Sequence, residues 1–225
     1  MAKKTQNLSE SIEKMTFKAP QPMEYFVNIE NDKDRVKYIS RIEKIIRNSM
    51  EYRDCINYLK ENCDLNRCAF FQNVTSEKRT KRNKVSIELH HEPFTLFDYV
   101  SVVVNKYLDQ GYRLNDLLIA DEVLELHYEN KVGLVPLSKT IHQVIHNSSK
   151  LIVPLNMCYG EYSQFLSEYD EYIPDELYEK LSKKIDQTNN LTPESFDALK
   201  KQFLYLDVEG FEEAKEVEVA GSCVA

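Results

Sequence analysis

The stretches Val85-Ser86-Ile87-Glu88-Leu89-His90-His91 and Gly133-Leu134-Val135-Pro136-Leu137-Ser138-Lys139-Thr140-Ile141-His142-Gln143-Val144-Ile145-His146-Asn147 contain four of the five histidines of the chain. Apolar and polar residues alternate in the first stretch, and this pattern predicts an extended strand with one apolar face. His90 and His91 end the stretch as neighbours. If the strand includes both, their side chains point to opposite sides.

The second stretch combines a short apolar run with the start of a helix. Ser138 follows the run and is a suitable N-cap residue. His142 and His146 are four residues apart, so a helix places both imidazoles on one face, about one turn from each other. This spacing suits two ligands of one small cation.

A strand that ends in His-His, a Leu-x-Pro-Leu segment and a helical His-x3-His resemble the HNH endonucleases, also called ββα-metal or His-Me finger nucleases. The resemblance implies that His90, His142 and His146 hold a metal ion and that His91 is the general base that deprotonates the attacking water. The amino-acid sequence of residues 68–73 and 87–98 also resembles that of uncharacterised phage proteins of the HNH type. This likeness extends from about residue 65 to residue 170.

The sequence departs from the HNH pattern in the loop before the helix. Gly133 stands where that family has an asparagine that supports the loop, and Asn130 is the candidate substitute. Ser138 and Ile141 occupy positions where the family often has cysteines, so no structural zinc knuckle is expected beside the site.

The expected cofactor is one divalent metal ion. Three imidazoles favour zinc, nickel or another transition ion, whereas magnesium prefers oxygen ligands. The identity of the ion stays open among zinc, nickel, manganese and magnesium. The expected function is metal-dependent hydrolysis of phosphodiester bonds in DNA. The alternative is a non-catalytic phage DNA-binding or assembly module, because the same ligands in a structural site would clamp a strand to a helix.

A dense cluster of basic residues precedes the histidine strand. It could contact the phosphate backbone of DNA or could be an ordinary exposed turn. The net charge of −8 argues against a protein whose whole surface coats nucleic acid, but it permits one local basic contact. The cluster consists of Lys78, Arg79, Lys81, Arg82 and Lys84.

The expected fold class is α+β, with a small ββα-metal hairpin-plus-helix core in a mostly helical domain. His127 is expected in a core or on the surface rather than as a ligand. Cys63 and Cys68 are expected to pack rather than to bind zinc. The predicted segments are a flexible leader (1–30), an N-terminal helical segment (31–62), an HNH-like domain (63–172) with a helical insertion (92–130), C-terminal helices (173–208) and an acidic flexible tail (209–225).

Composition restricts the location and the partners. No apolar run approaches the length that spans a membrane, and no secretory signal is evident. Five cysteines without a framework spacing favour reduced thiols. We therefore expect a cytoplasmic protein, in the host cytoplasm if a phage encodes it. Its expected partners are DNA and, in some contexts, phage or host proteins, but no membrane; the oligomeric state stays open.

Overall fold

The computed structural model describes residues 29, 31–71, 74–76, 86–147 and 151–194. The described part is mostly helical and has one two-stranded antiparallel sheet, so the fold belongs to the α+β class. Almost all of the predicted leader, the whole predicted acidic tail and the basic cluster lie outside the described residues. The elements, in order, are α2 (Asp32–Asn48), α3 (Met50–Asn62), β1 (Ile87–His91), α4 (Leu96–Asp109), α5 (Asp116–Tyr128), β2 (Leu134–Ser138), α6 (Lys139–Asn147), η2 (Leu155–Met157), α7 (Tyr162–Tyr169), η3 (Asp170–Tyr172) and α8 (Asp175–Asn189).

Side-chain caps determine where the helices before and after the first strand begin. Asn31 accepts a hydrogen bond from the backbone of Asp34 at the start of α2. Ser49 separates α2 from α3, because its side chain caps α3 while its backbone N–H bonds back to Ile46. Thr95 opens α4 with a full capping box.

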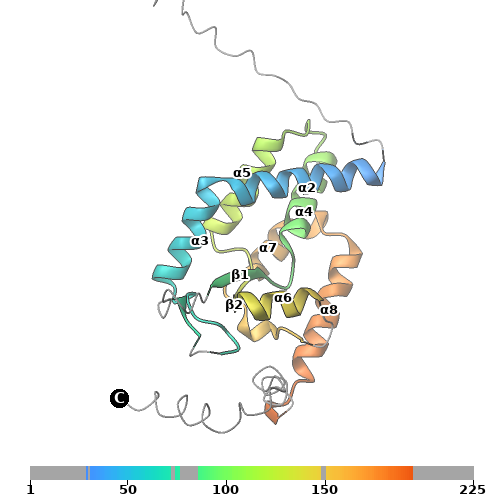
Figure 1. Cartoon of the computed structure of the whole chain (residues 1–225). Coiled ribbons are helices and arrows are strands. Elements are labelled where there is room, and N and C mark those ends of the chain that lie inside the picture. The colour runs from blue at the N-terminus through green and yellow to red at the C-terminus, as the bar shows by residue number, and fades with distance from the viewer. Residues whose placement is uncertain (1–28, 30, 72–73, 77–85, 148–150, 195–225) are drawn as a thin grey trace, which may run out of the picture.

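The helices share one large hydrophobic core. Its fully buried members include Ile39 of α2, Val100 of α4 and Ile119 of α5, and Leu177 of α8 joins them. Figure 1 shows α2, α4 and α5 on one side of the small sheet and α6 on the other. The predicted N-terminal segment, insertion and C-terminal helices thus contribute to the same core, although the sequence analysis assigned them to separate segments.

The sheet brings together the two stretches that contain the histidines. In its register His90 lies opposite Val135 and His91 lies opposite Leu134. Helix α6 follows β2 directly and buries Ile141 in a second, smaller core with Val135 and Leu137. The sheet therefore lies between the large helical core and the small core under α6.

Gly133 occupies a position that allows no side chain. A Cβ added there would lie 1.9 Å from the backbone oxygen of Glu92. The Gly133 N–H donates to the hydroxyl of Tyr99 at 3.0 Å, and its carbonyl accepts from the Glu92 N–H at 3.0 Å. The close approach of the two chain segments explains why the asparagine expected by resemblance is absent: this backbone cannot accommodate it.

We predict that Gly133→Ala destabilises the protein by more than about 2 kcal/mol, because the added methyl group must displace backbone rather than a side chain. Gly111→Ala is the matched control: a Cβ at Gly111 meets nothing within 4 Å, and only its φ of +70° opposes alanine. That substitution should cost about 1 kcal/mol. Urea unfolding of both variants measures the difference, and equal losses of stability would contradict the packing argument.

Candidate metal centre

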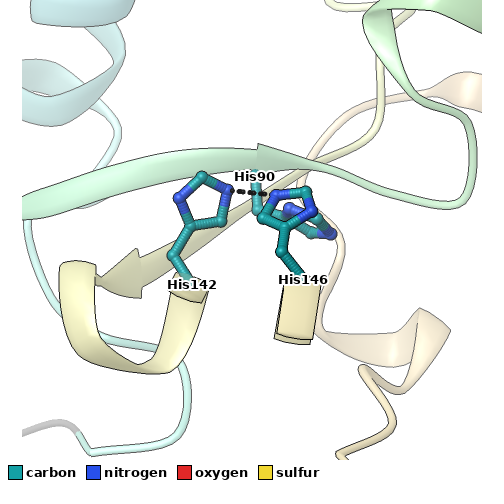
Figure 2. Close-up of side chains that lie close together, drawn as sticks. All are labelled: His90, His142 and His146. Carbon is teal, nitrogen blue, oxygen red and sulfur yellow. Dashed lines mark hydrogen bonds between the residues drawn. The ribbon is translucent and has the colours of Figure 1, made fainter. Parts of the chain in front are cut away.

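Three histidines from two elements converge beside the sheet. His90 comes from β1, whereas His142 and His146 come from α6, and one potential ligand atom of each lies within 4.8 Å of the other two. Figure 2 shows the three rings turned toward one another. The structure thus brings together the three residues that the sequence analysis assigned to a metal ion. The group contains imidazoles alone, which suits zinc, nickel or copper better than magnesium.

The tautomer of a neutral His142 ring follows from its neighbours. Its Nδ1 lies 2.6 Å from a carboxylate oxygen of Glu88. A carboxylate only accepts hydrogen bonds, so Nδ1 carries the proton and Nε2 has a free lone pair. That Nε2 lies 3.0 Å from Nε2 of His146. With both rings neutral, the His146 nitrogen donates the single proton between them; a divalent ion could replace this proton and bind both nitrogens.

His90 is buried and also has a carboxylate neighbour. Its side chain is 9 % exposed, and its Nε2 lies 3.4 Å from Oε2 of Glu92. The other carboxylate oxygen of Glu92 lies 2.8 Å from the ammonium of Lys184 in α8. Burial raises the pKa of Glu92, but the contacts with His90 and Lys184 outweigh this effect and hold its pKa below the usual value. Glu92 is therefore ionised at neutral pH.

His146 forms the outer side of the cluster. Partial burial and the neighbouring His142 lower its pKa below 6.5, which favours the neutral, ligating imidazole. His146 is exposed to solvent, whereas His90 is buried and His142 is intermediate. An ion held by the three rings would consequently have one side open to water or to another ligand.

His91 lies on the opposite face of β1, as the alternation of the strand predicts. Its Nε2 is 3.0 Å from Nε2 of His127 in α5, and its ring stacks on Tyr52 of α3. The Nδ1 of His127 lies 2.7 Å from the carbonyl oxygen of Val123, so that nitrogen carries the proton. Neutral His127 then accepts at Nε2, and His91 donates from Nε2. The two rings form a buried, neutral hydrogen-bonded pair.

This pair affects the role that the HNH resemblance implies for His91. A general base must come within hydrogen-bond reach of the water that it deprotonates. His91 is only 6 % exposed and faces α3 and α5, away from the three converging histidines. The structure does not bring His91 to the cluster of His90, His142 and His146, and catalysis by its imidazole would require the side chain to leave this position.

The remaining candidates serve the fold where the structure describes them. Asn130 has a left-handed φ of 61° just after α5, and its carbonyl accepts from the N–H of Glu161 at 2.6 Å, so its backbone shapes the loop before β2. His127 is buried in the pair with His91. Cys63 and Cys68 contact different cores.

Two carboxylates that were not predicted, Glu88 and Glu92, contact the cluster. The sequence holds a signal for them, because each lies two residues from His90 and an extended chain places such residues on the same face. Such carboxylate partners orient metal-binding histidines in many proteins.

Comparisons with known proteins identify one family. The model of the family described as "Bacteriophage G278-like virion protein" matches residues 2–216. No curated protein and no solved structure matches the chain. Among the described residues, none of the helices combines the length and the apolar character that crossing a membrane requires.

The buried histidine pair predicts a specific pH dependence of folding. Burial lowers the pKa of His127 to about 4 from its ordinary value of 6.5, despite the opposing hydrogen bond to Val123. Between these pH values the unfolded chain binds a proton at this residue that the folded chain does not. The contribution of His127 to stability is therefore complete above pH 6.5 and falls by about 1.4 kcal/mol per pH unit toward pH 4.

Urea unfolding at pH 7 and pH 5, in the presence of a chelator that removes metal, measures this effect. His127→Gln, whose side-chain oxygen can still accept from His91, should lose about 2 kcal/mol less than the wild type over this interval. An identical pH dependence of the two proteins would refute the account of the pair.

Proposed function

The chain belongs to the bacteriophage G278-like virion protein family, and on that premise we propose that it is a structural module whose three histidines bind one divalent transition-metal ion. The family confirms the expected phage origin. In the proposal β1, β2 and α6 form a ββα-metal unit of the kind expected from the sequence. The ion clamps the strand to the helix and thereby stabilises a component of the phage particle.

The observation that carries the proposal is the convergence of His90, His142 and His146 from a strand and a helix. Two of these rings contact carboxylates, Glu88 and Glu92, which can fix their tautomers before an ion binds. Histidines that lie together by chance would not be expected to have carboxylates that orient their rings. This arrangement supports the proposal that the site is prepared for an ion.

The position of the histidines explains what an ion would contribute. Helix α6 has only nine residues, and the hydrophobic core beneath it is much smaller than the core shared by the other helices. An ion that binds only the folded chain adds stability by mass action, about 2.7 kcal/mol when its free concentration is 100 times the dissociation constant. Such a gain is large compared with the free energy of unfolding of a typical domain, which is roughly 5–15 kcal/mol. The ion would therefore stabilise the contact between β1 and α6.

The second candidate function is an HNH-type endonuclease acting on DNA. The exposed His146 favours it, because three protein ligands and one open position characterise catalytic zinc sites. The buried position of His91 favours the structural module instead. A contact with DNA through the predicted basic cluster remains a prediction from the sequence, since that cluster lies outside the described residues.

We predict that the purified protein binds about one zinc or nickel ion per chain and that the double substitution His142→Ala, His146→Ala abolishes binding. Metal analysis after dialysis gives the stoichiometry, and titration of the apoprotein gives the affinity. Gln143→Ala is the matched control, because Gln143 is an exposed residue on the same helix. Equal metal content in the wild type and the double variant would refute the proposed site.

A nicking assay on plasmid DNA separates the two candidate functions. The structural proposal predicts no cleavage by the wild type above the background of the double variant, with zinc, nickel, manganese or magnesium. Metal-dependent nicking that the double variant loses would establish the endonuclease instead.

The variant His91→Ala adds a second criterion. Its structural position predicts a lower melting temperature with unchanged metal content, because the substitution leaves a cavity and an unpaired His127 nitrogen. A general base would behave differently: its loss would leave the melting temperature unchanged and slow cleavage by about 10²–10⁴-fold.

A further inference from the structure

The buried carboxylate of Glu92 has two different neighbours. Glu92 follows β1 directly and is 4 % exposed. Its Oε2 lies 3.4 Å from Nε2 of His90, and its Oε1 lies 2.8 Å from Nζ of Lys184. The Glu92 N–H donates to the Gly133 carbonyl at 3.0 Å, so the backbone is fixed as well. The side chain therefore connects the metal cluster to α8.

Helix α8 holds Lys184 in place independently of the cluster. Leu177 and Leu181 of α8 belong to the large core, and Lys180 forms an ion pair with Asp98 at 2.5 Å. Beyond Lys184, the hydroxyl of Thr188 accepts from the N–H of Leu155 at 3.1 Å. Because both sides of Lys184 are anchored, its ammonium is held 2.8 Å from Glu92 Oε1 as the partner of an ion pair.

These contacts determine which nitrogen of His90 is free for an ion. The carboxylate of Glu92 lies 3.4 Å from Nε2 of His90 and favours a proton on that nitrogen, because a carboxylate only accepts hydrogen bonds. The lone pair is then on Nδ1. His142 has the opposite arrangement, since its Nδ1 donates to Glu88 and its Nε2 is free.

We propose that Glu92 is a positioning residue of the metal site, which makes His90 bind the ion through Nδ1, and that Lys184 fixes the orientation of Glu92. This inference rests on the proposed metal-binding function. In this arrangement the ion is bound by two different imidazole nitrogens, Nδ1 of His90 from the strand and Nε2 of His142 from the helix. The arrangement also couples α8 to the site, because a displacement of Lys184 would release Glu92.

The first experiment reads the tautomer directly. Long-range ¹H–¹⁵N spectra of the zinc-loaded wild-type protein distinguish metal-bound, protonated and free imidazole nitrogens. We expect His90 to show a zinc-bound Nδ1 and a protonated Nε2, and His142 to show the reverse. A zinc-bound Nε2 on His90 would overturn the inference, and this measurement requires no variant that could fail to fold.

The second experiment uses the fact that a glutamine side chain has one oxygen that accepts hydrogen bonds and one NH₂ group that donates them. In Glu92→Gln the donor Lys184 attracts the amide oxygen, so the amide NH₂ turns toward His90. His90 must then accept at Nε2 and carry its proton on Nδ1, the nitrogen needed by the ion. Zinc affinity, measured by competition with a chromophoric chelator, should fall by about 10–100-fold, the range found for such partners.

Removing Lys184 should rescue this variant. In Glu92→Gln, Lys184→Met the amide is free to turn its oxygen toward His90, so affinity should recover by several-fold. Lys184→Met alone should have a smaller effect, because the carboxylate accepts in either orientation. The double-mutant cycle isolates this coupling from the plain effect of charge. Lys183→Met is the matched control, since exposed Lys183 faces Glu179 on the same helix at 3.9 Å.

The outcomes separate this inference from the function on which it rests. If the wild type binds no zinc, the proposed function fails and the inference fails with it. If the wild type binds zinc and Glu92→Gln binds it equally well, only the role of Glu92 is overturned. An additive cycle, in which Lys184→Met has the same effect in both backgrounds, would overturn the role of Lys184. Far-UV circular dichroism verifies that each variant is folded.

Discussion

The two-residue period of strand β1 is the constraint on which the arrangement of the histidines depends. Successive side chains of a strand point to opposite faces, so His90 and His91 cannot serve the same site while the strand remains regular. His90 faces α6 and the rings of His142 and His146, whereas His91 faces α5 and the large core. One short strand thus anchors two clusters of imidazoles with different chemistry.

The environments of the two clusters explain that difference. The His91–His127 pair is enclosed by Tyr52 and Tyr99, and burial keeps both rings neutral. The other cluster has the carboxylates of Glu88 and Glu92 nearby and one exposed ring, conditions that suit a cation. The contact between Gly133 and Glu92 fixes the backbone between the clusters. The same closeness excludes the asparagine that an HNH nuclease would have there.

Much of the fold was predictable because local chemistry determines it. Thr95 and Asn115 are of residue types that favour helix N-caps, and both cap helices in the structure. The break at Ser49 was not predicted, since the apolar spacing continues across it and only the hydroxyl bond to Tyr52 ends the pattern.

The histidine cluster was predictable in part for a similar reason: His-x3-His on a helix places two imidazoles on one face, whereas the choice of His90 rather than His91 as the third came from the resemblance to HNH nucleases. The partner of His91 was not predictable, because His127 lies 36 residues away along the chain. The contact between Lys184 and Glu92 likewise depends on how α8 docks, and no local pattern in the sequence encodes that.

X-ray absorption spectroscopy at the zinc edge of the loaded protein tests the central claim most directly. The account predicts a first shell of three imidazole nitrogens at about 2.0–2.1 Å, with one further light ligand from solvent. It also predicts that the imidazole scattering disappears when His142 and His146 are replaced. A shell of sulfur atoms at about 2.3 Å, or one of oxygen atoms without imidazole scattering, would contradict it.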